Sequence, residues 1–465
     1  MFVEKNATIS HDALLKLQAV TQGEVMTPDD PGYDQARMNW NVNVDQYPAV
    51  IVAARNTNDV VQAVRFAIAH KLQIAVKSTG HGALVPINDG LLLVTSQMTA
   101  VEIDADNQTA RAEAGAKWGM VLQPAQQFGL APLLGSSPEV GVIGYTLGGG
   151  MGWLARKYGM AVDSVISFEI VTPAGELVQA SATENSDLYW ALRGGGGNFG
   201  VVVAMTMRLY PVATVYAGNL YYPISLAREV YQRYREWVKT APYELTSSVV
   251  MMNYPPLPQL PDVLRGQTYI QVRGCYTGPV EDGESLLSFW RDWQTPVLDD
   301  FKARPFSEAA LISNDPVDPM PAAVSGGWLR EIDDTVIDAL IESVPPTDGP
   351  PLLVFAEIRH AGGAIKGLNR TETAFSLRDA DFLLEMISVT PTPEAHTAVL
   401  QYTNGIKQRI ASALTGGIYM NFTDGAEARA DAPKGYTAEA YTRLQQVKAA
   451  YDPDNRFDHS FNLNA

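Results

Sequence analysis

The first half of the chain alternates short apolar segments with segments of helical periodicity. Residues 49–54 (AVIVAA) form an unbroken apolar run, which is typical of a buried strand. Thr57-Asn58-Asp59 then precede apolar residues at helical spacing, which predicts the start of a helix. The same reasoning predicts strands at 72–77, 90–94, 101–103, 109–114, 165–172, 177–180 and 201–210, and helices at 118–128 and 186–192.

The pattern changes after Pro211. Longer strand candidates and amphipathic helices follow, interrupted by proline-rich loops at 254–261 and 315–321. This predicts an antiparallel sheet covered by helices, followed by a C-terminal amphipathic helix. The predicted strands lie at 269–275, 352–359 and 417–421, and the predicted helices at 226–240, 284–293, 393–414 and 437–450.

A chain of 465 residues is too long for one ordinary core, so more than one domain is expected. The change of pattern places a first domain at 1–211 and a second at 212–422. Residues 423–465 are expected to form a C-terminal segment that returns to the first domain.

Composition and charge exclude several classes of protein. The formal net charge of −17 and the lack of a basic run argue against nucleic-acid binding. The single cysteine, Cys275, allows no internal disulfide and no cysteine-based metal site, and no metal is expected. Residues 1–17 lack the basic start and apolar run of a signal peptide, and no segment is apolar over the ~20 residues of a membrane span. A cytoplasmic protein without a membrane partner is expected.

Three glycine-rich segments carry the strongest functional signal. They are KSTGHG at 77–82, a longer segment at 135–159 and RGGGGNFG at 193–200. Glycine lets backbone amides approach a ligand closely, and a large cofactor carrying phosphates is the usual ligand. His81 follows a predicted strand inside the first segment, so it is accessible. The combination indicates a flavin held partly by backbone and partly by a side-chain bond.

RGGGGNFG also contains the GxGxxG spacing of a nicotinamide-binding turn, through Gly195, Gly197 and Gly200. That turn needs a strand before the glycines and a helix after them. Here a predicted helix comes before and a β-branched strand comes after. No acidic residue stands at 218–222 to bind a ribose, so this interpretation is rejected.

Two other segments allow alternatives. Gly148, Gly149, Gly150 and Gly152 form either a flexible surface loop or a buried turn, and their apolar flanks favour the turn. In 417–422, strand alternation would put Tyr419 and Asn421 on one face. That polar pair suits either a pocket wall or a solvent-facing surface.

Four segments in order, KSTGHG, GSSPEVGVIGYTLGGGMGWLARKYG, DLYWALRGGGGNFGVV and YDPDNRF, resemble the vanillyl-alcohol-oxidase type of FAD-linked oxidoreductases. Within that type the chain most closely resembles the berberine-bridge-enzyme-like branch. The resemblance covers nearly the whole chain and is strongest at 45–211 and 415–465. It implies an α+β, two-domain fold with a PCMH-type FAD-binding domain and an antiparallel-sheet substrate domain covered by helices.

The resemblance implies that His81 bonds covalently to the 8α-methyl group of FAD. Ser137 stands where some members carry a second, cysteine link, so a single link is expected. Val140 matches a position associated with oxygen access. The expected cofactor-binding residues besides His81 are Lys77, Ser78, Thr79, Gly80, Gly82, Ser137, Pro138, Val140, Gly141, Gly144, Tyr145, Gly148, Gly149, Gly150, Gly152, Trp153, Gly197, Asn198, Gly200, Val201, Val202, Asn421 and Asn462.

The same resemblance names Tyr419, Tyr158 and Lys366 as catalytic candidates. If Tyr419 is the base, its pKa must fall from about 10 toward 7. The Lys366 ammonium would supply part of that shift if it lies nearby.

The implied activity is that of an oxidase, in which a C–H next to O or N of a small molecule gives a hydride to flavin N5 and O2 is reduced to hydrogen peroxide. Open alternatives are a dehydrogenase with another electron acceptor, an oxidative tailoring enzyme of natural-product biosynthesis, and a flavin-binding protein without catalysis.

Overall fold

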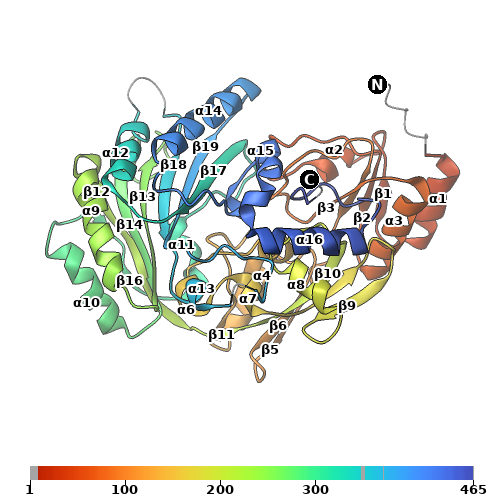
Figure 1. Cartoon of the computed structure of the whole chain (residues 1–465), viewed down its shortest axis with the longest axis horizontal. Coiled ribbons are helices and arrows are strands. Elements are labelled where there is room, and N and C mark those ends of the chain that lie inside the picture. The colour runs from red at the N-terminus through yellow and green to blue at the C-terminus, as the bar shows by residue number, and fades with distance from the viewer. Residues whose placement is uncertain (1–8, 347–350, 370, 464–465) are drawn as a thin grey trace.

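A computed structural model of the chain describes residues 9–346, 351–369 and 371–463. Residues 1–8 and 464–465 lie outside the described residues. They belong to the N-terminal stretch 1–17 and to the expected C-terminal segment 423–465. The chain folds into two α+β parts that lie side by side, with the N- and C-terminal segments both in one of them (Figure 1). The predicted α+β class is confirmed, whereas the domain boundaries at 211 and 422 stay predictions.

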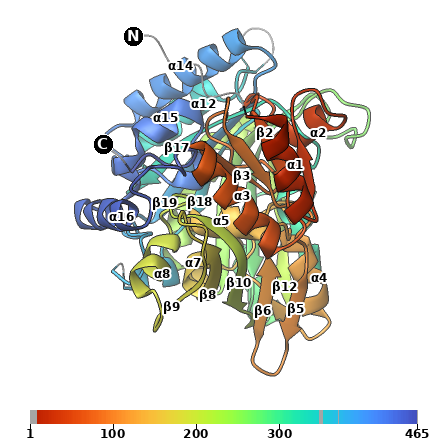
Figure 2. The ribbon, with the colours of Figure 1, turned by 90° about the vertical axis from the view of Figure 1, so that its right-hand side faces the viewer.

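The part that holds both termini contains a small sheet of order β1-β2-β4-β3, in which β2, β4 and β3 are parallel. Helices α1 and α3 lie beside this sheet (Figure 2). The side chain of Asn56 accepts the Asp59 N–H and caps α3 at the predicted start. These elements are α1 (His11–Val20), β1 (Glu24–Met26), α2 (Tyr33–Arg37), β2 (Val50–Ala53), α3 (Thr57–His70), β3 (Ile74–Lys77) and β4 (Leu91–Val94).

A second, antiparallel sheet of order β5-β6-β10-β8-β9 completes this part, and the β5–β6 hairpin projects from it (Figure 2). The predicted strands and helices between residues 101 and 208 are confirmed. The elements are β5 (Val101–Asp104), β6 (Thr109–Glu113), α4 (Trp118–Gln126), β7 (Leu130–Ala131), α5 (Val142–Leu147), α6 (Ala155–Tyr158), α7 (Ala161–Ser164), β8 (Val165–Val171), β9 (Leu177–Ser181), α8 (Ser186–Leu192), β10 (Val201–Arg208) and β11 (Tyr210–Pro211).

The other part is a large antiparallel sheet of order β15-β12-β14-β13-β18-β19-β17, with β16 paired to β12. Helices α9, α10, α12 and α14 cover its outer face (Figure 1). The elements are β12 (Thr214–Pro223), α9 (Ala227–Trp237), β13 (Leu245–Asn253), β14 (Thr268–Tyr276), α10 (Val280–Arg291), β15 (Leu298–Asp299), β16 (Lys302–Pro305), α11 (Ala310–Ser313), β17 (Ala322–Leu329), α12 (Asp334–Ser343), β18 (Phe355–His360), α13 (Ala364–Gly367), β19 (Phe382–Val389) and α14 (Pro393–Arg409).

Strand alternation gives this sheet two unlike faces. Val249, Ile358 and Leu384 belong to the apolar core under the outer helices. Their neighbours along the strands, such as Glu357 and Glu385, are also buried but point the other way, toward the rest of the molecule. A polar, buried sheet face is therefore turned toward the glycine-rich segments.

The C-terminal segment is short and helical. Its elements are η4 (Met420–Phe422), α15 (Gly425–Ala430), η5 (Ala432–Gly435) and α16 (Ala438–Tyr451). In α16 the buried Lys448 ammonium bonds Asp452 Oδ2 at 2.6 Å, and it also donates to the carbonyls of Asn198 and Phe457. The end of the chain thus ties down the RGGGGNFG loop.

The predicted strand at 417–421 is wrong. The segment is a turn that leads into η4, with Gly416 in the left-handed region at φ +87°. Strand pairing is replaced by side-chain bonds from this segment to a distant glycine turn. Tyr419 and Asn421 nevertheless lie together, because Asn421 Nδ2 donates to the Tyr419 hydroxyl at 3.2 Å.

No helix within the described residues is long and apolar enough to cross a membrane. The same part of the chain holds no cluster of His, Cys, Asp and Glu suited to a metal ion.

Candidate active site

A pocket lies between the glycine-rich segment and the large sheet. Ser136, Met151, Gly152 and Trp153 form one wall, and Thr246, Ser247 and Arg359 form the other. The first wall comes from the segment 135–159 singled out in the sequence. The second comes from β13 and β18 of the sheet.

The Tyr419 side chain fills the space beside the turn Gly148–Gly150. The backbone N–H groups of Gly150 and Met151 both donate to the Tyr419 hydroxyl, each at 3.0 Å. Asn421 Nδ2 donates to the Tyr145 carbonyl at 3.0 Å. A side chain on Gly148 would collide with Asn421, since an added Cβ would lie 1.8 Å from its Oδ1. This turn is buried, as its apolar flanks predicted, and the Tyr419 segment fills it.

The electrostatics of Tyr419 differ from the expectation. Burial raises its pKa to about 12, although the N–H donors from Met151, Gly150 and Asn421 and the charge of Arg359 favour the phenolate. The expected help from Lys366 is wrong, because that ammonium pairs with Asp381 at 3.0 Å and both groups are about half exposed. Tyr419 is therefore a neutral phenol at neutral pH.

Tyr158 has its own aromatic and cationic neighbours. Its ring packs on that of Tyr210 with centroids 4.3 Å apart, and Lys157 lies over it. Its helix, α6, packs against α13, which carries Lys366. The structure thus brings the helices of Tyr158 and Lys366 together, and Tyr419 packs in the same buried cluster as Ala155 and Ile365 of those helices.

His81 lies in a defined environment. Its ring stacks on Trp40, with centroids 4.3 Å apart and planes 19° apart. Burial lowers the pKa of His81 to about 4, the Lys117 charge lowers it further and the Glu139 charge opposes this. Lys117 and Glu139 are themselves paired at 2.7 Å. The imidazole is uncharged at neutral pH, so a ring nitrogen keeps its lone pair.

Residues 136–141 lie against this site. Pro138 and Val140 accept the N–H groups of Gly119 and Trp118, at 2.8 and 3.0 Å, so the segment is held like a strand. A Cβ on Gly141 would lie 3.2 Å from Ser78 Oγ and 3.7 Å from Thr79. Ser78, Thr79 and Gly141 therefore lie together, and their cofactor roles stay predictions.

The residues around His81 fit a large polar cofactor. Ser78 Oγ and the Tyr145 hydroxyl are buried without a hydrogen-bond partner, which is unusual for such groups. Added Cβ atoms on Gly82 and Gly144 would meet nothing within 4 Å. Unpaired polar atoms and open glycines are what an FAD group would use.

Lys77, by contrast, points to protein. Its ammonium donates to the carbonyls of Ala36 and Met38, and burial lowers its pKa to about 8. Trp153 is buried in the pocket wall.

RGGGGNFG joins α8 to β10, the helix-to-strand order on which the nicotinamide interpretation was rejected. The amide of Gly196 donates to the Leu147 carbonyl at 3.0 Å, which connects this loop to the long glycine segment. The amide of Gly197 donates to Ser460 Oγ, and Asn198 Nδ2 to the Gly195 carbonyl.

The remaining predicted cofactor residues pack within the chain. An added Cβ on Gly200 would lie 2.4 Å from the Val171 carbonyl oxygen. Val201 and Val202 are buried in the cores, and the Asn462 carbonyl accepts the Tyr441 hydroxyl. Their cofactor roles stay predictions.

A buried cluster of charges on the sheet was not predicted from the sequence. Glu357 accepts from Ser248 at 2.6 Å and from Arg273 at 3.2 Å, and its other oxygen accepts from Arg359 Nε at 2.8 Å. Arg359 Nη2 lies 2.9 Å from Glu385 Oε2, the distance of an ion pair, but without the alignment of a hydrogen bond.

The two glutamates of this cluster have opposite pKa shifts. For Glu357, burial is outweighed by Arg359, Arg273 and the hydrogen bonds, and the pKa falls to about 2. For Glu385, burial dominates over the attraction of Arg359, the charges of Glu357 and Asp315 add to it, and the pKa rises to about 8. The two stand directly opposite each other on β18 and β19, where like charges repel.

A signal for this cluster existed in the sequence. FAEIRH and FLLEMISV place glutamate and arginine within otherwise apolar strands. An alternating strand with charges predicts either a solvent-facing row or a buried site. The fold decides for the buried site, because the strand Thr268–Tyr276 places Arg273 beside Glu357.

The comparisons with known proteins agree with this arrangement. Residues 48–181 match the family model described as an FAD binding domain, and residues 418–464 match the model described as berberine and berberine like. The chain is 29% identical over 450 residues to YgaK, an uncharacterized FAD-linked oxidoreductase of Bacillus subtilis (strain 168), covering 94% of this chain and 96% of YgaK.

A second relative is (R)-6-hydroxynicotine oxidase of Paenarthrobacter nicotinovorans, 28% identical over 467 residues, with 95% and 96% of the two chains covered. The crystal structure of 6-hydroxy-D-nicotine oxidase from Arthrobacter nicotinovorans superimposes with a TM-score of 0.83 at 24% identity, over 96% of this chain and 98% of that one.

Phl p 4 superimposes with a TM-score of 0.81 at 20% identity, over 97% of this chain and 99% of its own, both as the wild type, a glucose dehydrogenase, and as an isoleucine-to-valine variant, a glucose oxidase. These solved structures confirm the predicted fold.

Proposed function

We propose that this chain, a member of the FAD-linked oxidoreductases that join an FAD binding domain to a berberine-like C-terminal segment, is an oxidase of a small organic substrate. Bound FAD would accept a hydride from a C–H next to oxygen or nitrogen and pass the electrons to O2, which gives hydrogen peroxide. The substrate would lie in the pocket between the segment 135–159 and the sheet.

The observation that carries this proposal is the buried Glu385 beside that pocket. Its pKa of about 8 lies near neutral pH, where a general base works best. Its Oε2 is buried without an aligned hydrogen-bond donor and lies 2.9 Å from Nη2 of Arg359, a residue of the pocket wall. We assign to Glu385 the removal of the proton from the substrate hydroxyl or amine. Arg359, which lines the pocket, would orient the substrate.

Tyr419 has a different role in this proposal. As a neutral phenol bonded to two amides of the glycine turn, it holds the two parts of the molecule together at the pocket. It also excludes water from the turn, since it is 1% exposed.

His81 would carry the covalent link to FAD, and Ser78, Gly141, Gly144 and Tyr145 would surround the cofactor. The uncharged imidazole supports the link, because a protonated ring nitrogen has no electron pair to share. Ser137 in place of a cysteine supports a single bond.

The choice between oxidase and dehydrogenase rests on Val140, which by resemblance to the family stands at a position associated with oxygen access. The Phl p 4 pair associates valine with oxidase activity and isoleucine with dehydrogenase activity. Val140 is half-buried beside the proposed cofactor site. A Val140→Ile variant should reduce O2 more slowly while keeping its rate with an artificial acceptor.

The test begins with acid precipitation of the purified chain and of His81→Ala. Yellow colour that stays with the wild-type polypeptide alone would support the covalent link. Anaerobic flavin bleaching by a panel of alcohols, amines and sugars would then identify the substrate, and O2 would restore the colour with release of hydrogen peroxide. Absence of flavin from the native protein would overturn the proposal, and bleaching at the wild-type rate in Glu385→Gln would overturn the role of Glu385.

A further inference from the structure

A second loop lies directly on the loop that carries His81. We name residues 33–47 the Trp40 loop, after the residue that stacks on His81. Gly80 adopts φ +81°, and an added Cβ there would lie 2.8 Å from both Asn39 Cα and Trp40 N. Only glycine permits this approach, so the two loops are fitted together next to the imidazole.

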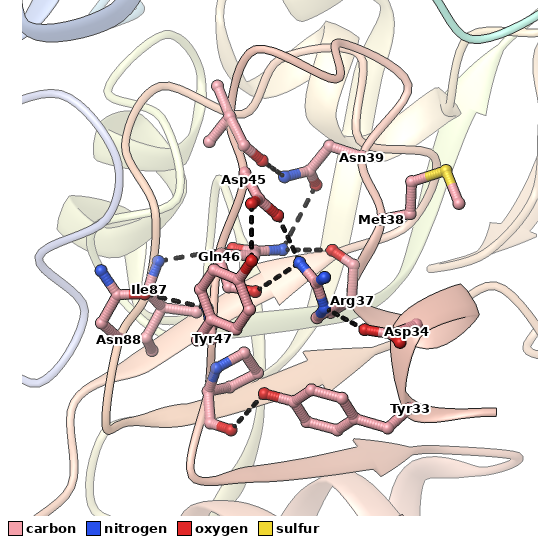
Figure 3. Close-up of polar contacts among 12 residues, drawn as sticks. Tyr33, Asp34, Arg37, Met38, Asn39, Asp45, Gln46, Tyr47, Ile87 and Asn88 are labelled. Carbon is pink, nitrogen blue, oxygen red and sulfur yellow. Dashed lines mark hydrogen bonds and ion pairs between the residues drawn. The ribbon is translucent and has the colours of Figure 1, made fainter. Parts of the chain in front are cut away.

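A polar network stiffens the Trp40 loop (Figure 3). Arg37 donates to Asp34 at 2.7 Å, pairs with Asp45 and lies over the Tyr47 ring at 4.2 Å. It also donates to the Gln46 carbonyl, while Gln46 Nε2 donates back to the Arg37 carbonyl at 2.8 Å. The two limbs of the loop are thus cross-linked close to Trp40.

Both ends of the His81 loop are fixed to this frame. On one side, the Lys77 ammonium donates to the Ala36 and Met38 carbonyls. On the other, the Tyr47 amide donates to Asn88 Oδ1 at 2.9 Å (Figure 3). A displacement of the Trp40 loop would therefore move the backbone around His81.

Trp40 also bonds to the sheet-bearing part of the molecule. Its Nε1 donates to the Val317 carbonyl at 2.9 Å, and its carbonyl accepts the Met320 amide at 3.0 Å. Asp315, in the same proline-rich loop, interacts electrostatically with Arg359 and Glu385. One indole thus contacts His81 on its face and the second part of the chain at its edge.

We propose that Trp40 is a positioning residue for the attachment of flavin to His81, and that its bond to Val317 makes attachment depend on the docking of the sheet. This inference rests on the proposed covalent link. Stacking fixes the plane of the imidazole, and orientation of a reacting group contributes strongly to the rate of bond formation.

The bond joins a His81 ring nitrogen to the 8α-carbon. The 8α-methyl loses one hydrogen as a proton, and the imidazole loses its N–H proton. The electron pair of the broken C–H bond remains in the flavin ring together with these protons, leaving reduced flavin. O2, the acceptor of the proposed oxidase, reoxidises it and becomes hydrogen peroxide.

The test uses the full chain with Trp40→Leu, Trp40→Phe and His81→Ala. Trp293→Leu is the matched control, because Trp293 is also half-buried and in ring contact, with Tyr222, on the outer helix layer. The measurements are total FAD per chain, the rate at which added FAD becomes acid-stable at several pH values, and the thermal unfolding midpoint.

Trp40→Leu should bind FAD but attach it about tenfold more slowly or worse, at an unchanged unfolding midpoint. Trp40→Phe keeps a ring on His81 but loses the N–H bond to the Val317 carbonyl, so it should recover only part of the rate. The control should attach FAD as the wild type does. Attachment at the wild-type rate in Trp40→Leu would overturn the positioning role alone. If the wild-type protein binds FAD but the FAD never becomes acid-stable, the covalent link is overturned, and this inference with it.

Discussion

The two walls of the pocket are built in opposite ways. The wall from residues 135–159 has no charged lining residue, and glycines such as Gly148 and Gly152 pack so closely that added side chains would collide with other segments. The wall from the sheet includes Arg359, which belongs to a cluster of charged side chains with the buried Arg273, Glu357 and Glu385. One wall offers fixed shape without charge, and the other offers charge that responds to pH.

This difference separates two tasks. A wall without charged lining residues cannot titrate, so it keeps its form while reacting groups change charge. The charged cluster holds one glutamate ionised and leaves the other near its titration point, because the arginines neutralise Glu357 more fully than Glu385. Shape and proton transfer are thereby assigned to different elements.

The largest effect is expected from breaking the charged cluster. Glu357→Gln leaves Arg273 and Arg359 buried without their shared carboxylate, which should lower the free energy of unfolding by about 3–5 kcal/mol. Chemical denaturation measures this. The control Glu244→Gln, in a partly exposed pair with Lys157, should cost less than about 1 kcal/mol. If the two variants lose the same free energy of unfolding, the buried cluster does not stabilise the fold more than an exposed ion pair does.

A smaller loss is expected from breaking the glycine-rich wall. Gly152→Ala would place a Cβ 1.7 Å from the Leu134 carbonyl oxygen, so the backbone must shift, at a cost of about 3 kcal/mol. Gly405→Ala in α14, where a Cβ meets nothing, should instead be neutral or stabilise by about 0.5–1 kcal/mol. Denaturation curves compare the two, and a Gly152→Ala protein of wild-type stability would refute the close packing.

Removing the Tyr419 hydroxyl that the glycine turn binds should cost less again. Tyr419→Phe leaves the Gly150 and Met151 amides buried without an acceptor, at about 2 kcal/mol. Tyr189→Phe removes only a donor to the Val165 carbonyl and is the milder control. Tyr419→Phe also tests whether Tyr419 acts in catalysis. If flavin reduction slows by far more than the loss of stability explains, Tyr419 is the base after all.

The last comparison measures a dependence on pH rather than a single loss of stability. The pKa of Glu385 is raised in the folded state, so the folded chain holds a proton that the unfolded chain releases above about pH 5. Stability should therefore fall as pH rises from about 5 to about 8, by at most ~1.4 kcal/mol per pH unit. Glu385→Gln should flatten this slope and match the wild type near pH 5. An unchanged slope would show that Glu385 titrates normally.

Much of the fold could be predicted from the sequence, because its signals are local. The run 49–54, the cap before α3 and the alternation at 109–114 each depend on neighbouring residues. The buried turn at Gly148–Gly150 was predicted for the same reason, from its apolar flanks. Strands β12, β13, β17 and β19 were missed, because they are buried on both faces and so show no regular alternation of apolar and polar residues.

The candidate site was harder to predict from the sequence, because the residues that form it lie far apart along the chain. Tyr419 and Asn421 were found by motif, but their true partners, Gly150 and Tyr145, lie more than two hundred residues away. Lys366 was expected near Tyr419, whereas the fold pairs it with Asp381. The Glu357–Arg359–Glu385 cluster exists only once three strands are side by side, so strand order had to be known first.

The bond from Lys448 to the Asn198 carbonyl has a consequence for protein synthesis. The two residues are 250 positions apart, so the ribosome needs roughly 10–50 s to produce the second after the first. During that interval the RGGGGNFG loop has been made but lacks the ammonium that secures it. The nascent chain therefore emerges with an unfinished loop, and a chaperone or a cofactor that meets it before its last residues are translated meets a different surface from that of the finished protein.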